Sequence, residues 1–196
     1  MKKAKQNLLV LASSSENREK ILSRLNVPYK IFKPKVDEES IIKKYAPRIV
    51  VKKLSLLKAL KAKEKYKGSF ILSADTIVYS RRKILNKTYD EKEALSNIKW
   101  LSGRRHRVYT GMTFISNENR IHYSITQTKV QFKNLSIQEM QRYILTREWE
   151  GCAGSYAIQG YAEAFVKLLV GSYSNVVGLP LNKVHNLLEK YKLYNA

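Results

Sequence analysis

The chain has 196 residues, 44% of them hydrophobic, which suits one compact domain or two closely coupled lobes with room for an active-site cleft. Its 37 basic and 16 acidic residues give a formal net charge of +21, which predicts an anionic partner without fixing that partner's size. The single cysteine, Cys152, excludes an internal disulfide and no stretch approaches the roughly 20 apolar residues of a membrane span, so we expect a cytoplasmic protein.

The first part of the chain is predicted to alternate strands and helices. A short apolar run is typical of a buried strand, and Ser13 with Glu16 matches a capping box at the start of the helix that follows. The expected strands are 8–12 and 27–32, and the expected helices run through about residue 26 and over residues 49–65. The second helix has helical spacing at Val50, Leu54, Leu57 and Leu60, which predicts that these side chains are buried.

The rest of the chain continues this alternation. Arg81-Arg82 indicates a turn, Gly103 is a natural helix stop, and Ser136 with Glu139 matches a second capping box. Strands are expected at 69–79, 108–116 and 121–132, and helices at 90–101, 136–145 and 181–191. One hairpin among alternating helices and strands predicts an α/β domain with a mixed sheet. Neither GxGxxG nor GxxxxGK[ST] is present, so a Rossmann or P-loop mechanism is unsupported.

The first candidate site is the strand-to-helix junction that begins at Ser13. Three consecutive serines lie where the free N–H groups of a helix start would face an anion, and Arg18 adds a fork of charged donors. This pattern favours a phosphate-binding junction. The alternative is that the serines only cap the helix.

Acidic side chains form the second candidate site. Asp75 lies between the apolar pairs Ile71-Leu72 and Ile77-Val78, and a carboxylate beside a buried strand is costly unless it is paired, protonated or bound to metal. Together with Asp37 and Glu38 it offers the oxygen ligands that suit Mg²⁺ or Mn²⁺, and it could take a proton from attacking water. The alternative is a strand-end aspartate paired with a nearby lysine.

Two lysines and one glutamine are further candidates. Lys58 on its helix and Lys87 after Leu85 could clamp phosphate, although in a lysine-rich chain each could equally be solvated surface. Gln159 lies in the glycine-bounded segment 154–160 and could contact a base edge, whereas the plain alternative is a turn. Cys152 is a poor nucleophile candidate because no histidine falls in a pairing motif with it.

Taken in order, these segments resemble the Maf family, also called septum formation proteins, from about Leu8 to Leu188. The motifs are Leu11-Ala12-Ser13-Ser14-Ser15-x-x-Arg18, Val36-Asp37-Glu38, Ser73-Ala74-Asp75-Thr76-Ile77-Val78, Leu101-Ser102-Gly103, Val108-Tyr109-Thr110-Gly111, Ala153-Gly154-Ser155-Tyr156-x-Ile158-Gln159-Gly160 and Ser174-Asn175-Val176-Val177-Gly178-Leu179-Pro180. The resemblance implies a single domain over residues 1–196 that splits nucleoside triphosphates into a monophosphate and diphosphate with a divalent metal, Mg²⁺ or Mn²⁺. It also implies a two-lobed α/β fold related to inosine triphosphate pyrophosphatases, with an elongated mixed sheet flanked by helices, a cleft between the lobes, and often a homodimer.

The resemblance also implies a role for each candidate. Asp75 would be the proton acceptor, Ser13 and Arg18 would bind phosphate, and Glu38 would be a metal-associated acid. Lys58 and Lys87 would contact phosphate.

Base choice is linked in the family to three positions. Thr76 and Gln159 fit the members that act on thymidine and uridine triphosphates, whereas Asn17 replaces the arginine found there and Glu16 replaces a proline. Thr88 also replaces a proline after Lys87, which is expected to loosen that loop. A broad nucleotide range follows.

The rival hypothesis is a nucleic-acid-binding or cell-division regulatory protein without hydrolase activity, motivated by the charge and the family's name, although we expect no nucleic-acid and no membrane partner.

Overall fold

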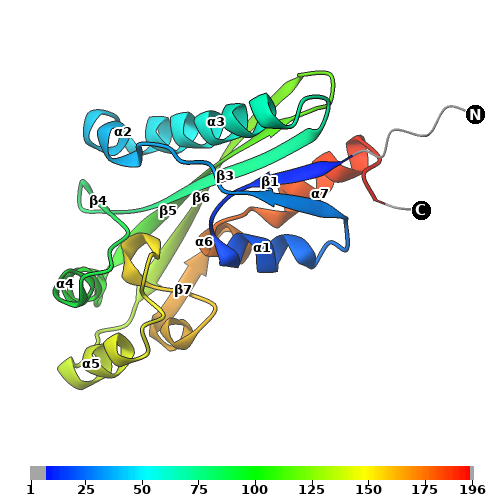
Figure 1. The fold of residues 1–196 in the computed structure, drawn as a ribbon. Helices are drawn as coiled ribbons and strands as arrows, with labels where there is room; N and C mark the ends of the chain where they lie inside the picture. The colour runs from blue at the N-terminus through cyan, green and yellow to red at the C-terminus, as the bar shows by residue number, and fades with distance from the viewer. Residues whose placement is uncertain (1–7, 195–196) are drawn as a thin grey trace, which may run out of the picture. The chain divides into compact units, whose positions relative to one another are not determined.

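The computed structural model describes residues 8–194 (Figure 1). The strands are β1 (Leu9–Ala12), β2 (Tyr29–Phe32), β3 (Phe70–Ser80), β4 (Lys83–Leu85), β5 (Arg105–Ile115), β6 (Ile121–Phe132) and β7 (Val166–Val170). The α-helices are α1 (Glu16–Ser23), α2 (Glu38–Lys44), α3 (Pro47–Lys65), α4 (Glu91–Leu101), α5 (Ile137–Leu145), α6 (Tyr173–Val177) and α7 (Leu181–Lys190). Two 3-10 helices, η1 (Ala153–Ser155) and η2 (Tyr161–Phe165), complete the set. None of the helices between residues 8 and 194 is both long and apolar enough to cross a bilayer.

The seven strands form one mixed sheet. Its order is β2-β1-β3-β5-β6-β7, with β4 paired to β3. Strand β1 runs parallel to both β2 and β3, whereas β4 is antiparallel to β3 and β7 is antiparallel to β6. The predicted α/β class with a mixed sheet is therefore confirmed.

The chain divides into two compact units, which agrees with the two lobes expected from the sequence. Among the described residues, the first unit comprises 8–75, 111–125 and 178–194, and the second comprises 76–110 and 126–177. Strands β3, β5 and β6 each contribute residues to both units. The boundary along β3 falls between Asp75 and Thr76.

The buried face of α3 differs from the prediction. Val50 and Leu54 are buried as expected, but Leu57 and Leu60 are 39% and 40% exposed. The face that packs on the first unit's core instead carries Val50, Val51, Leu54, Ser55, Lys58, Ala59 and Ala62. These residues follow the three- and four-residue spacing of one helix face. Lys58 therefore lies on the buried face of α3, and Leu57 does not.

The capping box predicted at Ser13 is also wrong. Helix α1 begins at Glu16 with Ser15 as its N-cap residue, and no side chain caps it. It ends at Ser23, earlier than expected, and Asn26 has a left-handed φ of 51° that breaks the helical path. The hydroxyl of Ser13 is thereby available for other contacts.

Most other predicted elements are confirmed. The turn at Arg81-Arg82 is present, with both residues at positive φ. Ser136 and Glu139 form the predicted capping box of α5, with both of its hydrogen bonds. Four elements were not predicted from the sequence, because they are short and have little periodicity to detect: α2, β4, β7 and α6.

Candidate active site

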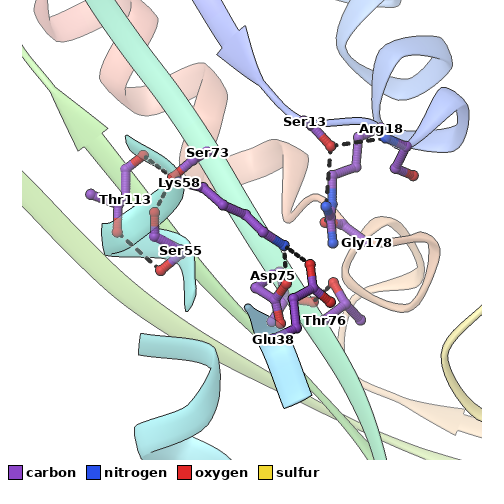
Figure 2. Close-up of polar contacts among 12 residues, drawn as sticks. Ser13, Arg18, Glu38, Ser55, Lys58, Ser73, Asp75, Thr76, Thr113 and Gly178 are labelled. Atoms are coloured by element: carbon purple, nitrogen blue, oxygen red, sulfur yellow. Dashed lines mark hydrogen bonds and ion pairs between the residues drawn. The ribbon is translucent and has the colours of Figure 1, made fainter. Parts of the chain in front are cut away.

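The end of β1 and the start of α1 hold a polar junction in the first unit. The Ser13 Oγ accepts hydrogen bonds from the Ser15 backbone N–H at 3.1 Å and from Arg18 Nη1 at 3.2 Å (Figure 2). Arg18 Nε donates to the Gly178 carbonyl at 2.8 Å. Both side chains are buried, so the guanidinium is held in one orientation by two oxygens from distant parts of the sequence.

A second cluster joins α2, α3 and β3 in the same unit. Lys58 Nζ lies 2.5 Å from Asp75 Oδ1 and 2.6 Å from Glu38 Oε1 (Figure 2). Lys58 is 5% exposed and Asp75 only 1%, whereas Glu38 is half-buried. Two carboxylates from different elements thus converge on one buried cation.

The two clusters are electrostatically coupled. Burial lowers the pKa of Arg18, and the negative charges of Asp75 and Glu38 oppose that shift. The guanidinium therefore lies within the field of both carboxylates. Two cations and two anions balance one another in a buried region, which meets the requirement that buried charges be paired.

Local sequence explains how each acidic and basic group is placed. Asp37 is the N-cap of α2 and accepts from the Ser40 backbone N–H at 3.3 Å, which fixes Glu38 as the first helical residue. Lys58 lies on the buried face of α3, and Asp75 lies in β3, whose residues 70–78 are all buried. The acidic pair Asp37 and Glu38 singled out from the sequence is thus a helix start that presents one carboxylate to Lys58.

The remaining candidates occupy other positions. Asn17 is half-buried in α1. Thr76, Lys87 and Gln159 belong to the second unit, where the Thr76 hydroxyl lies 2.9 Å from that of Thr110. Lys87 is exposed after β4, and Gln159 is exposed in a turn between η1 and η2. The structure thus brings five candidates together in the first unit. They are Ser13, Arg18, Glu38, Lys58 and Asp75.

The threonine that follows Lys87 makes two hydrogen bonds within its surroundings. The buried Thr88 accepts a hydrogen bond on its Oγ1 from the Asp90 backbone N–H at 3.0 Å. Its carbonyl accepts another from the Gly151 N–H at 3.1 Å. These two contacts hold Thr88 in place, and the threonine hydroxyl supplies a side-chain acceptor that proline lacks.

Nucleophilic alternatives in the second unit are unfavourable. Burial raises the pKa of the Cys152 thiol to about 11, so it stays protonated at neutral pH. Burial lowers the pKa of His106 to about 3, and this ring packs among Phe132 and Tyr156. The sequence-based rejection of Cys152 as a nucleophile agrees with this chemistry.

The carboxylate pair fits a small divalent cation. Glu38 and Asp75 already share one cationic group, and their oxygens are the hard ligands that Mg²⁺ and Mn²⁺ prefer. Within residues 8–194 no group of three or more His, Cys, Asp or Glu could hold a metal by itself. Mg²⁺ commonly uses one or two carboxylates and completes its shell with water and phosphate oxygens, so two carboxylates suffice.

Sequence reasoning missed Gly178 as the carbonyl partner of Arg18. Gly178 has a φ of 122°, a conformation that favours glycine, and it lies just before Pro180 and α7. The glycine-proline spacing was visible, but its contact with residue 18 crosses 160 positions of sequence. No local pattern reveals a pairing at that distance.

Comparisons with known proteins show which sequences and which fold this chain resembles. The family model described as Maf-like protein matches residues 8–191. A "Nucleoside triphosphate pyrophosphatase" of Ehrlichia chaffeensis is 41% identical over 184 residues, covering 93% of this chain and 95% of that protein. A "dTTP/UTP pyrophosphatase" of Chelativorans sp. is 41% identical over 194 residues, covering 95% and 93%. The solved structure of a HAM1 protein from Coxiella burnetii has a TM-score of 0.51 at 15% identity over 93% of this chain and 98% of that chain, which shows a shared fold.

Proposed function

Because this chain belongs to the Maf-like protein family, we propose that it hydrolyses nucleoside triphosphates between the α- and β-phosphates, giving a monophosphate and diphosphate. The observation that carries the proposal is the convergence of Glu38 and Asp75 on Lys58, within the field of Arg18. Such a site combines cations for phosphate oxygens with a carboxylate for water. The relatives named as pyrophosphatases support the same activity, so a regulator without hydrolase activity is not favoured.

Each residue has a distinct role in this proposal. Arg18 donates to phosphate oxygens from a position fixed by Ser13 and the Gly178 carbonyl. Asp75 accepts the proton of the water whose oxygen attacks the α-phosphorus, and the bond from that phosphorus to the bridging oxygen breaks as diphosphate leaves. Lys58 holds the carboxylates in place before substrate binds and then lies beside the phosphate charge.

A divalent cation completes the proposed chemistry. Glu38 and Asp75 would hold Mg²⁺ or Mn²⁺, and such an ion, when bound, neutralises charge on the phosphate oxygens. Lys87 and Gln159, on the second unit, are proposed to contact phosphate and base respectively. When the metal ion binds, the two carboxylates must exchange the Lys58 ammonium for the metal as their cationic partner. Glu38 is half-buried and can move for this exchange more readily than the buried Asp75.

Substrate range is proposed to be broad. Thr76 and Gln159 match the pattern linked to thymidine and uridine triphosphates, and one relative is named for that activity. Asn17 departs from the pattern, and relatives with the more general name are equally similar. We therefore expect canonical pyrimidine and modified triphosphates all to be hydrolysed. We also propose that the enzyme acts in the cytoplasm. It is proposed to form a homodimer, which light scattering would detect.

One assay tests the reaction. Purified protein is incubated with a panel of canonical and modified nucleoside triphosphates, with Mg²⁺, with Mn²⁺ or with chelator, and diphosphate is scored separately from orthophosphate. Release of one diphosphate for each monophosphate, only with metal, is expected. Orthophosphate as the sole inorganic product would show that a different bond is cleaved, and no release from any nucleotide would refute the proposal.

Changing Arg18 to Lys should weaken substrate binding. Lysine keeps the charge but cannot donate at once to Ser13, to the Gly178 carbonyl and to phosphate. A lost charge-assisted hydrogen bond is worth roughly 1.5–3 kcal/mol, so KM should rise by about tenfold or more. Arg24→Lys is the matched control, because Arg24 is exposed at the end of α1. Equal KM values for both variants would remove Arg18 from the phosphate site.

A further inference from the structure

Three buried hydroxyl side chains join α3 to the sheet within the first unit (Figure 2). Ser73 Oγ donates to the Ser55 carbonyl at 2.6 Å and lies 3.4 Å from the Thr113 carbonyl. Ser55 Oγ and Thr113 Oγ1 are 3.0 Å apart. All three residues have no exposed surface, so these contacts form in a region from which water is excluded.

The direction of the hydroxyl bonds follows from proton counting. Ser55 Oγ donates its only proton to the Lys52 carbonyl at 3.1 Å, so it accepts from the Thr113 hydroxyl. The Ser73 hydroxyl donates its proton to the Ser55 carbonyl. Helix α3 therefore accepts one hydrogen bond from β3 and one from β5 at a single residue, Ser55.

A close backbone approach fixes α3 one turn earlier. A Cβ built at Gly111 would lie 2.3 Å from the Val51 carbonyl oxygen, so only glycine fits at this point of β5. Val51 precedes Ser55 by one helical turn, and Gly111 precedes Thr113 on the same side of the strand. Two successive turns of α3 are thus held at defined positions along β5.

The same elements carry the charged cluster. Ser55 lies one turn before Lys58 on the buried face of α3, and Ser73 lies two residues before Asp75 in β3. A shift of α3 along the sheet would move Lys58 Nζ relative to Asp75 Oδ1, which are 2.5 Å apart. The hydrogen bonds of Ser55 and Ser73 lie close in sequence to Lys58 and Asp75, and they resist such a shift.

We propose that Ser55, Ser73 and Thr113 are positioning residues that set the register of α3 against β3 and so hold Lys58 between Glu38 and Asp75. None of them is a catalytic residue. The inference rests on the proposed function for its kinetic consequence, but the placement of Lys58 is measurable without turnover. Ser13, which follows β1, and Arg18, in α1, are the residues proposed to bind phosphate, and they lie outside this network.

A pair of substitutions at Thr113 tests the kinetic consequence. Thr113→Val keeps the shape but removes the donor to Ser55, whereas Thr113→Ser keeps the donor and removes a methyl group. A misplacement on the order of 1 Å can cost about 100-fold in rate, so Thr113→Val should lower kcat by about tenfold while KM changes less than about twofold. Thr113→Ser should keep kcat near that of the wild type, even if it is the less stable variant.

Lys58 reactivity tests the placement itself. The Lys58 amine is protected by burial and by two carboxylates, so its acetylation by acetic anhydride in the native protein, followed by peptide mass spectrometry, should be slow. Thr113→Val and Ser55→Ala should accelerate it severalfold, and Thr113→Ser should not. This readout holds even if the protein released no diphosphate, which separates failure of the inference from failure of the proposed function.

Ser116→Ala is the matched control. Ser116 is a buried serine that follows β5, and its hydroxyl accepts from the Arg120 N–H in the hairpin to β6. Its backbone carbonyl accepts from Lys63 Nζ of α3 at 2.8 Å, and alanine keeps that contact. Its loss should cost stability like the other variants but change neither kcat nor Lys58 acetylation. The inference is overturned if Thr113→Val leaves Lys58 as protected as in the wild type, or if Thr113→Val and Thr113→Ser lower kcat equally.

Discussion

Replacing Asp75 with Asn is expected to reduce diphosphate release by about 10²- to 10⁴-fold, the usual contribution of a general base. The amide keeps the size of the carboxyl group but cannot accept a proton from water, and it is a poorer ligand for a divalent cation. The fold should persist, because Lys58 retains its 2.6 Å contact with Glu38. Steady-state kinetics with far-ultraviolet circular dichroism measures both outcomes.

Asp90→Asn provides the same chemical change outside the site. Asp90 caps α4 by accepting from the Glu93 backbone N–H at 2.7 Å, and asparagine caps helices about as well as aspartate. This control should retain wild-type kcat and KM. If purified Asp75→Asn released diphosphate as fast as Asp90→Asn, Asp75 would not be the proton acceptor.

The location of Asp75 could be predicted from sequence because its neighbours are apolar on both sides. A charged residue in a strand such as β3 breaks the expected pattern, and its cost indicates a partner or a ligand. The junction at Ser13 and Arg18 was equally visible, because a short apolar run followed by small hydroxyl residues predicts a strand-to-helix turn. In both cases the signal is local in sequence.

The role of α3 was harder to predict because hydrophobicity misled the assignment of its buried face. Leu57 and Leu60 are more apolar than Lys58, yet the spacing from Val50 through Leu54 continues to Lys58. Following the four-residue spacing strictly would have placed this lysine inward. The hydroxyl network lay beyond sequence reasoning, because Ser55 and Thr113 are 58 positions apart and neither belongs to a recognisable motif.

Replacing Lys58 with Met should destabilise the protein by about 3–5 kcal/mol, because Asp75 then carries a buried charge that has lost its closest cation. For a protein of this size each kcal/mol corresponds to roughly 2–4 °C in Tm, so a fall of about 10 °C is expected by calorimetry. Lys43→Met is the control, since Lys43 also pairs with a glutamate at 2.6 Å but is 73% exposed. That exposed pair should contribute less than about 1 kcal/mol.

Two further measurements show whether the loss comes from unpaired carboxylates. Asp75→Asn introduced into the Lys58→Met background should recover part of the lost stability, because it removes the charge that was left buried. Adding Mg²⁺ or Mn²⁺ should raise the Tm of Lys58→Met more than that of the wild type, because a divalent cation can take the place of the ammonium between Glu38 and Asp75. A Tm for Lys58→Met that matches Lys43→Met, with or without metal, would show that the carboxylates do not depend on a shared cation.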